Sequence, residues 1–280
     1  MEKTLKRYFL IFTLPTVIAF AFAFLIPFVQ GVYLSFCKFT TVSNATWTGL
    51  ANYKAAFSGG QGFMNALGFT ASFTVVSVVT INLLAFTIAL LLTRKIKGTN
   101  IFRTVFFMPN LIGGIVLGYI WMLILNGVLA KFGVSLTYDP RYGFWGLVIL
   151  MNWQMIGYMM IIYVAGLTSI SSDYVEAATI DGAKSSHILR YIILPLLMPS
   201  ITQCLFLSMV NSLKVYDLNI SLTNGNPFRL SEAVTMNVYQ TAFSSNLMGY
   251  GSAKALLLVL VIAGVSLIQV AITSSKEVEL

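Results

Sequence analysis

Residues 70–92 read TASFTVVSVVTINLLAFTIALLL, an apolar run of 23 residues without a single Asp, Glu, Lys or Arg. A helix that crosses a bilayer needs about 20 consecutive, mostly apolar residues. The run meets that length, and its backbone polar groups could be satisfied internally as a helix. The sequence therefore predicts a membrane-spanning helix at this position.

The composition of the whole chain points to lipid as its main solvent. Of the 280 residues, 58% are hydrophobic and 9% are charged, and the mean hydropathy is +0.84. A soluble domain has about 45–50% apolar and about 25% charged residues, so an ordinary soluble globule is excluded. The net charge of +8 does not indicate nucleic-acid binding, because the basic residues lie mostly between the apolar runs.

Scanning for spans of this length predicts an all-α membrane protein with six transmembrane helices. The first run is longer than one span, and Pro15 and Pro27 inside it predict kinks. No part of the chain indicates a separate soluble domain, so residues 1–280 are expected to form one transmembrane domain. The six spans are expected at about 9–36, 70–92, 104–126, 144–166, 198–213 and 255–273.

The basic residues predict how the chain is oriented. No small-residue cleavage site follows the first apolar run, so we expect an uncleaved first span. Ten of the 17 Lys and Arg residues fall in the connections on one side of the membrane, and cytoplasmic connections are rich in such residues. Both termini are therefore predicted to be cytoplasmic. The basic connections are 1–8, 93–103, 167–197 and 273–280.

The most informative polar segment is the predicted cytoplasmic loop at about 172–195. Asp173 and Glu176 have the spacing of a capping box, Gly182 can end the short helix, and Ser185 or Ser186 can cap a second one. The small side chains on this helix would let another protein approach closely. The alternative is an amphipathic linker on the membrane surface. The small residues are Ala177, Ala178 and Gly182, and the helix also carries the charges of Glu176 and Asp181.

This spacing resembles the EAA motif in the membrane subunits of binding-protein-dependent ABC importers. The matching pattern is Glu176-Ala-Ala, then Gly182, then Ile192-Ile-Leu-Pro195. The resemblance implies a type I importer permease fold in which this loop forms cytoplasmic coupling helices. It also implies that the loop sits in a cleft of an ATPase subunit, that Glu176 meets a basic residue there, and that Gly182 makes the sharp turn. The residues that the resemblance assigns to ATPase coupling are Glu176, Ala177, Ala178, Asp181, Gly182, Leu194 and Pro195.

Three further segments are similar to the first permease of maltose- and glycerol-phosphate-type importers. Asn226 departs from that pattern, where a second Gly is usual, and so does Met198, where a basic residue is common. The resemblance implies a second permease in a heterodimer, a cytoplasmic ABC ATPase dimer, an extracytoplasmic solute-binding protein and a sugar, in the lipid of a prokaryotic inner membrane. The segments are Trp47–Tyr53, Arg103–Pro109 and Ser212–Pro227.

The sequence lacks the parts of a catalytic or nucleotide site. No Gly-Lys pair occurs, so there is no Walker A loop to hold a nucleotide phosphate. His187 is the one histidine, and Cys37 and Cys204 are the two cysteines, too few for a His/Cys metal site or a His-based triad. We therefore expect no catalytic residue, no metal and no cofactor, with ATP hydrolysis in a separate subunit.

A path for the solute is predicted from polar and aromatic residues inside the spans, namely Asn152, Trp153, Tyr158 and Asn211. Amides can donate and accept hydrogen bonds, and an aromatic ring can cover the apolar face of a sugar. Residues 152 and 158 lie roughly 120° apart around a helix and share a face only in part. The family resemblance favours Tyr158 and Asn211. The alternative is that these residues join helices or form an aromatic belt.

Two local contacts are also predicted. Gly114 and Gly118 have a small-xxx-small spacing, which favours close contact with another helix. Lys214 and Asp217, three residues apart, are expected to form a local ion pair.

The alternative function is an ion-coupled secondary carrier of a small polar solute. Such carriers tend to hold ionisable residues at mid-span and to show broken helices related by repeats. No charged residue lies in the middle of any predicted span, which counts against this alternative. The sequence leaves open which sugar is carried and which ATPase and binding protein take part.

Overall fold

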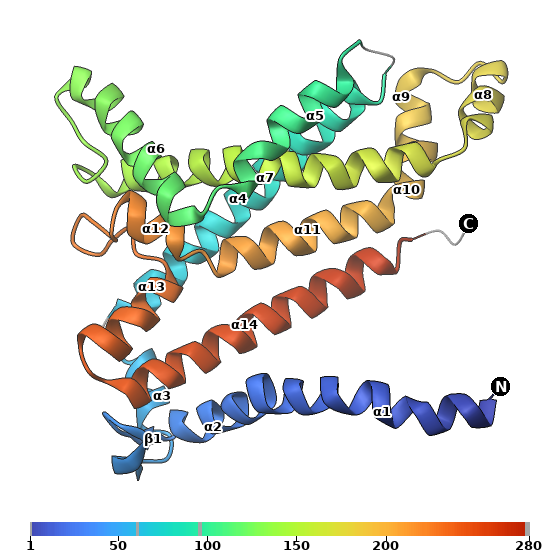
Figure 1. The fold of residues 1–280 in the computed structure, drawn as a ribbon. Helices are drawn as coiled ribbons and strands as arrows, with labels where there is room; N and C mark the ends of the chain where they lie inside the picture. The colour runs from blue at the N-terminus through green and yellow to red at the C-terminus, as the bar shows by residue number, and fades with distance from the viewer. Residues whose placement is uncertain (1, 60–61, 95–96, 278–280) are drawn as a thin grey trace. The chain divides into compact units, whose positions relative to one another are not determined.

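The computed structural model describes residues 2–59, 62–94 and 97–277 and is almost entirely helical (Figure 1). The predicted basic connections 1–8, 93–103 and 273–280 each include residues outside this part. By its internal contacts the chain divides into two units, residues 1–63 with 237–258 and residues 64–236 with 259–280. Each unit is described by itself, and one domain over 1–280 stays a prediction.

The first unit begins with a long apolar helical segment. It consists of α1 (Glu2–Phe20), the π-helical turn η1 (Ala21–Leu25) and α2 (Ile26–Ser35). The π-helical turn lies between the two prolines for which kinks are predicted, and such turns are a common cause of helix bending. Phe20, Phe24 and Phe28 stack on one another at 5.2 and 6.1 Å and are exposed, as expected of a helix that faces lipid.

A short segment with two paired strands and a short helix follows α2. The strands β1 (Cys37–Lys38) and β2 (Thr46–Trp47) pair antiparallel around η2 (Val42–Asn44), and α3 (Ala51–Phe57) comes next. The side-chain amide of Asn52 donates to the carbonyls of Ser35 and Cys37 at 2.9 Å each. The Trp47 ring stacks on Phe36 at 5.3 Å. The Trp47–Tyr53 segment is therefore a structural device that ties the end of α2 to α3.

The unit closes around a buried lysine that the sequence did not single out. The helix α14 (Met248–Ser274) begins seven residues before the predicted sixth span, and this extension brings Lys254 into the helix. Lys254 is fully buried, and its ammonium donates to Asn237 Oδ1 and Thr241 Oγ1 at 2.8 Å each. These partners come from α13 (Val234–Tyr239) and η7 (Gln240–Ser244), so the lysine fastens both to α14.

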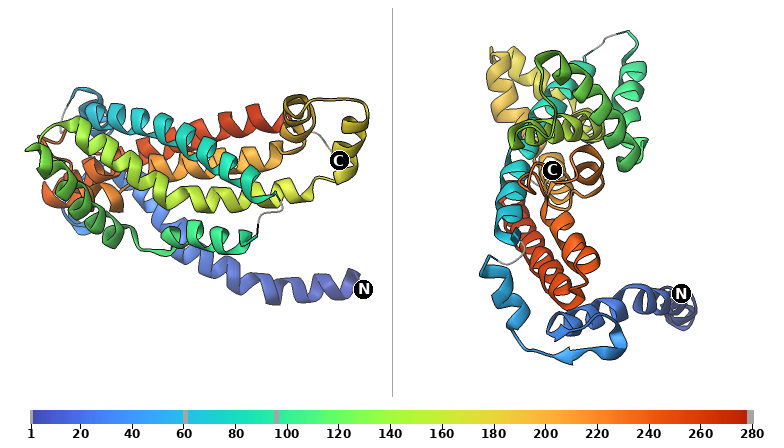
Figure 2. Two further views of the ribbon diagram at one scale, coloured as in Figure 1. Left: turned by 90° about the horizontal axis from the view of Figure 1, so that it is seen from above. Right: turned by 90° about the vertical axis from the view of Figure 1, so that its left-hand side faces the viewer.

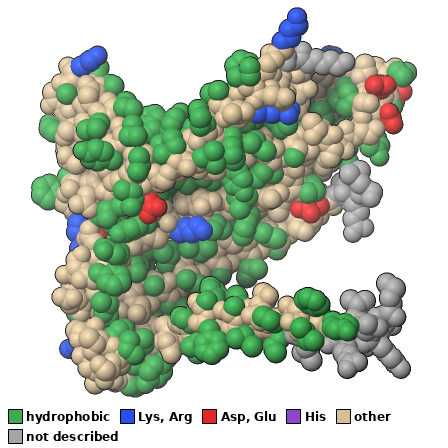
Figure 3. Space-filling view, viewed as in Figure 1, with side chains coloured by type: hydrophobic (Ala, Val, Ile, Leu, Met, Phe, Trp, Pro, Cys, Tyr) green, Lys and Arg blue, Asp and Glu red, His purple; other side chains and the backbone are tan. Residues whose placement is uncertain are grey.

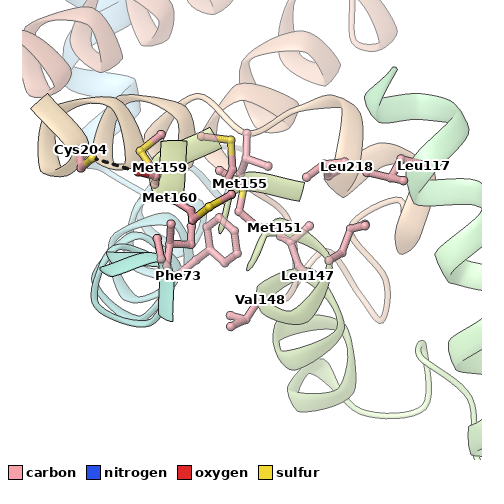
Figure 4. Packing of buried hydrophobic residues seen from close by; sticks show 14 of the residues in the cluster. Phe73, Leu117, Leu147, Val148, Met151, Met155, Met159, Met160, Cys204 and Leu218 are labelled. Carbon is pink, nitrogen blue, oxygen red and sulfur yellow. Dashed lines mark hydrogen bonds between the residues drawn. The ribbon is translucent and has the colours of Figure 1, made fainter. Parts of the chain in front are cut away.

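The second unit is built around α7 (Pro140–Ser169), the most buried of the apolar helices. Figure 4 shows the methionines of α7 packed with Phe73 of α4 (Phe63–Leu92). The thiol of Cys204, on α11 (Met198–Leu213), donates to the carbonyl of Met159 at 3.6 Å. The left view of Figure 2 shows α7 and α11 side by side, and in Figure 1 α4 crosses behind α7. The buried methionines are Met151, Met155, Met159 and Met160.

The predicted third span at 104–126 is wrong, because the chain breaks within it. The structure has α5 (Thr99–Phe107), the 3₁₀ turn η4 (Met108–Leu111), and then α6 (Gly114–Leu129) followed by η5 (Ala130–Phe132). Pro109 has no N–H to continue the helix, and Gly113 is extended, with φ −59° and ψ 135°. In this part of the chain, the helical segment that is long and apolar enough to cross a membrane is Gly114–Phe132.

Five helical segments in the described residues are long and apolar enough to cross a membrane. A sixth results if Ser185–Leu196 and α11, which meet at a bend of 70°, count as one span. The segment Ser185–Leu196 consists of α9 (Ser185–Ile188), the π-helical turn η6 (Leu189–Ile193) and α10 (Leu194–Leu196). The prediction of an all-α membrane protein is confirmed.

Glycines set the closest helix contacts in the second unit. A Cβ on Gly114 would lie 2.8 Å from Asp217 Cβ, and a Cβ on Gly118 would overlap Ser221, both on α12 (Asp217–Leu222). The predicted close contact through these two glycines is confirmed. A Cβ on Gly157 would overlap the backbone carbonyl of Phe106, so the backbone of α5 lies directly against the surface of α7 at this glycine.

Candidate functional site

The predicted coupling loop contains a short helix, α8 (Ser172–Ile180), which joins the end of α7 to α9. Its N-cap is Ser171, whose Oγ accepts from the backbone N–H of Asp173 at 3.3 Å. The predicted capping box of Asp173 and Glu176 is therefore wrong, because the helix starts one residue before Asp173. Asp173 still lies in the first turn, where its negative charge favours the helix.

The end of α8 is a tight turn at Gly182, as predicted. Gly182 has φ +80°, and its N–H donates to the carbonyl of Thr179 at 3.1 Å. The N–H of Ala183 donates to the carbonyl of Ala178 at 2.9 Å, which completes a Schellman motif. The prediction that Ser185 or Ser186 caps the next helix is wrong, because α9 begins at Ser185 after Lys184, which makes no side-chain cap.

The surface of α8 combines acidic, small and apolar side chains. Glu176, Ala177 and Asp181 are exposed, and Figure 3 shows acidic side chains gathered over α8. Ile180 is 86% exposed and Tyr174 is 50% exposed. Apolar groups this open on a charged helix outside the spans fit a surface that another protein covers.

The loop is attached to the membrane helices at both ends. Its first end continues from α7, and its second passes through α10, which contains Leu194 and Pro195, into α11. A Cβ on Gly166 of α7 would lie 2.7 Å from Leu197 Cδ1 and would overlap Ser200, so α7 and the start of α11 pack without slack. A displacement of α8 would therefore act on two packed helices at once.

A polar cavity of about 270 Å³ lies in the second unit where the third predicted span is broken. Three amide side chains reach it from three elements: Asn110 of η4, Gln154 of α7 and Asn211 of α11. Lys214 and Asp217 add one charge of each sign. The other lining residues are Gly114, Met151, Met155, Val215, Tyr216 and Leu218.

The amides leave hydrogen-bonding groups for a ligand. Asn211 Nδ2 donates to the carbonyl of Leu207 on its own helix at 2.8 Å, which leaves Oδ1 as an acceptor. Gln154 Nε2 makes a long contact of 3.5 Å with the carbonyl of Ile112. The predicted ion pair of Lys214 with Asp217 is wrong, because neither side chain forms an ion pair within 4 Å in the described part of the chain. The cavity can thus both donate to and accept from a neutral, hydroxyl-rich molecule.

Of the four residues predicted to line the solute path, Asn211 lies on this cavity and the other three lie elsewhere. Asn152 is buried and donates to the carbonyl of Val148 on its own helix. Trp153 is 42% exposed and lies 5.5 Å from the ring of Trp121. Tyr158 is partly buried against the core, with its ring 6.5 Å from Phe107. Solute contact by these three stays a prediction.

The prediction did not include Gln154 and Asn110. Gln154 adjoins two predicted residues, but its side of α7 could not be chosen without knowing which helices α7 contacts. Asn110 follows Pro109, and the combination of this proline with Gly113 was the signal that the span is broken. No group of three His, Cys, Asp or Glu side chains that could hold a metal occurs in residues 2–59, 62–94 and 97–277.

Comparison with known proteins places the chain among transport proteins. Residues 87–277 match the family described as binding-protein-dependent transport system inner membrane component. The chain is 41% identical to a probable starch degradation products transport system permease protein of Thermoanaerobacterium thermosulfurigenes, over 96% of this chain and 95% of that protein. It is 32% identical to a multiple sugar-binding transport system permease protein of Streptococcus mutans, over 99% of each.

The fold is likewise similar to a solved structure. A bacterial ABC transporter involved in the import of the acidic polysaccharide alginate contains a chain that matches with a TM-score of 0.81 and 19% identity, over 98% of both chains. The helical fold, the sequence match and these relatives agree. The chain therefore belongs to the family of binding-protein-dependent transport system inner membrane components and is a multi-pass membrane protein that serves transport, not an enzyme.

Proposed function

We propose that this chain is a permease subunit of an ATP-driven ABC importer and that it passes a sugar, an oligosaccharide, across the membrane. The observation that carries the proposal is the polar cavity on Asn110, Gln154 and Asn211, which lies among helices apolar enough to span a membrane. Polar groups at such depth are costly unless they face a cavity or a partner, and they mark substrate pathways.

The chemistry of the cavity favours a neutral sugar. Its amides can each donate and accept, and Lys214 and Asp217 give no net charge. Two permeases similar along nearly the whole chain carry names that refer to starch degradation products and to multiple sugars. A cavity of about 270 Å³ holds one sugar ring and its hydroxyls better than a long chain, so we infer that the oligosaccharide passes one unit at a time.

The proposed complex has four kinds of component. The solute arrives on an extracytoplasmic binding protein, as in the solved alginate transporter bound to a pentasaccharide-loaded periplasmic protein. This chain pairs with a second permease, and the pair rests on a cytoplasmic ABC ATPase dimer. The location is the inner membrane of a prokaryote with both termini cytoplasmic, which the distribution of Lys and Arg supports.

In this proposal α8 is the coupling helix to which the ATPase binds. Glu176 and Asp181 offer charge to a basic partner, Ala177 and Ala178 let it approach, and Gly182 fixes the turn. Leu194 and Pro195 carry the movement into α11. Closure of the ATPase would then move α7 and α11 together, and both helices line the cavity through Gln154 and Asn211.

The coupling role is tested with Glu176→Lys in the assembled complex in proteoliposomes. We expect ATP-driven uptake to fall at least tenfold and the ATPase to copurify poorly, because the substitution places a like charge against the basic partner. Asn100→Lys, exposed on α5 on the same predicted side, is the control and should keep uptake. Full uptake by Glu176→Lys would refute the role, and uptake that stops with an uncoupler while ATP remains would favour the secondary carrier.

The sugar path is tested with Asn211→Ala and Gln154→Ala. We expect each to raise the concentration of loaded binding protein needed for half-maximal uptake, or to lower the maximal rate, by about 5–20-fold for a hydrogen bond lost at a partly buried side chain. Thr87→Val is the control, because its hydroxyl bonds only the carbonyl of Leu83 on its own exposed helix face. Unchanged uptake in both amide variants would move the path away from this cavity.

A further inference from the structure

A second cavity, of about 500 Å³, opens as a groove between the beginnings of α4 and α7. The polar groups at its mouth, Asn65 on α4 and Arg141 on α7, come from the first turns of these helices, and Ser72 adds one hydroxyl further along α4. One to two turns further along, the groove is lined by the rings of Phe69, Phe144 and Trp145. The groove therefore changes from cationic and polar at its mouth to mostly aromatic, with one serine hydroxyl, at its inner end.

This change follows the depth of a bilayer. Both α4 and α7 have 30 residues, or about 45 Å at 1.5 Å per residue, whereas the hydrocarbon core is about 30 Å thick. If each helix is centred, about five residues at each end lie in the headgroup layer. Arg141 and Asn65 fall within these five residues, and Trp145 and Phe69 fall at or just below the hydrocarbon boundary.

The mouth of the groove carries a cation that is free to meet a ligand. Arg141 is exposed, and no ion pair within 4 Å involves it among the described residues. The nearby Asp139 is engaged as the N-cap of α7, where its Oδ1 accepts from the backbone N–H of Arg141 at 2.8 Å. The guanidinium of Arg141 therefore remains available for a phosphate, whose geometry it matches with paired N–H donors.

The aromatic wall is already formed. The ring of Phe144 meets Phe69 edge to face at 5.8 Å and Trp145 at 5.5 Å. Trp145 is 55% exposed, and the side chain of Leu230 also lines the groove. These rigid apolar surfaces need no rearrangement to receive a hydrocarbon chain.

We propose that this groove binds one anionic phospholipid, with its phosphate on Arg141 and Asn65 and an acyl chain along Phe69, Phe144 and Trp145. A sugar could also stack on Trp145, but the match between the polarity of the groove and the depth of the bilayer favours a lipid. The site lies outside the cavity assigned to the solute. The proposal needs only a membrane-spanning chain, so it stands or falls separately from sugar transport.

The test is native mass spectrometry of the purified complex in mild detergent, titrated with phosphatidylglycerol or with phosphatidylcholine. We expect the first phosphatidylglycerol to bind the unmodified protein more tightly than the first phosphatidylcholine. Arg141→Gln should weaken phosphatidylglycerol binding about fivefold, since one basic residue near an anionic lipid surface contributes about 1 kcal/mol. Trp145→Ala should weaken the binding of both phosphatidylglycerol and phosphatidylcholine.

Lys131→Gln is the matched control, because Lys131 is exposed on η5 and does not line the groove. Its lipid binding should equal that of the unmodified protein. Arg141→Lys is a second variant that keeps the positive charge, so it separates loss of charge from poor folding. It should bind phosphatidylglycerol more tightly than Arg141→Gln. Equal phosphatidylglycerol binding by Arg141→Gln would overturn the proposal. So would displacement of the lipid by a maltooligosaccharide, or by inorganic phosphate at the same concentration.

Discussion

The hydroxyl of Tyr163 on α7 donates a hydrogen bond of 2.8 Å to Oδ1 of Asn82 on α4. The same amide donates through Nδ2 to Ser208 Oγ on α11, also at 2.8 Å. The side chain of Asn82 therefore joins three membrane helices. Because Asn82 is buried, no water is available to replace these hydrogen bonds if they are lost.

Replacing Asn82 by Ala should therefore destabilise the bundle. Each interhelical hydrogen bond in a membrane contributes about 0.6 kcal/mol and at most about 1.7, so the loss of two should cost about 1–3 kcal/mol. Denaturant titration in mixed micelles measures this change. Thr80→Val is the control, because its hydroxyl bonds only carbonyls of its own helix, and its stability should change by less than about 0.5 kcal/mol. Equal stabilities of the two variants would show that the three-helix contact is not important.

Gly157→Ala should push α5 away from α7. The new methyl group would overlap the backbone carbonyl of Phe106, which cannot rotate aside as a side chain could. Overpacking of this kind costs about 1–3 kcal/mol or more. The thermal unfolding midpoint should fall, and cysteine crosslinks placed across α5 and α7 should form more slowly.

Gly127→Ala on α6 is the matched control for that substitution. A Cβ there would meet nothing within 4 Å, and Ala is the better helix former by about 1 kcal/mol. Its unfolding midpoint should stay unchanged or rise. A fall as large as that of Gly157→Ala would mean that any added methyl group is harmful, and the crossing would not be the cause.

Gly182→Ala should weaken the end of α8 without any steric overlap. Its φ of +80° costs a residue with a Cβ about 1–2 kcal/mol, and nothing lies within 4 Å of the new atom. Hydrogen exchange of the Ala183 amide, which is bonded to the Ala178 carbonyl, should become about fivefold to thirtyfold faster. Gly182→Asn should exchange nearly as slowly as the unmodified protein, because Asn tolerates this conformation. Identical exchange in all three proteins would contradict the assigned turn.

Asn219→Ala should loosen the loop between α12 and α13. Asn219 is 1% exposed, and its amide donates to the Ser231 carbonyl and accepts from the Ala233 N–H at 2.8 and 2.9 Å. Leaving both backbone groups without a partner should cost about 2–4 kcal/mol. Trypsin should then cleave after Arg229 much faster. Thr137→Ala, in an exposed loop, is the control and should leave that cleavage unchanged.

The sequence predicted the structure best where a feature depends on the residues of a single helix. The spans at 70–92, 144–166 and 198–213 all lie within helices of the structure, since the length of an apolar run determines whether a helix can cross lipid. Gly182 ends α8 because a residue without Cβ follows the last helical turn. The predicted start of that helix at Asp173 lies two residues too late, because Ser171, another good capping residue, caps the helix.

The sequence by itself determined a multi-pass helical membrane protein with a spaced motif in one loop, because hydropathy and spacing are properties of neighbouring residues. Only the tertiary structure decided which polar groups meet. Asn110, Gln154 and Asn211 lie on three elements far apart in the chain, and they share a cavity because the chain breaks at Pro109 and because α7 packs against both η4 and α11. Periodicity defines the faces of a helix but not their partners, since partner choice depends on side-chain fit across distant segments.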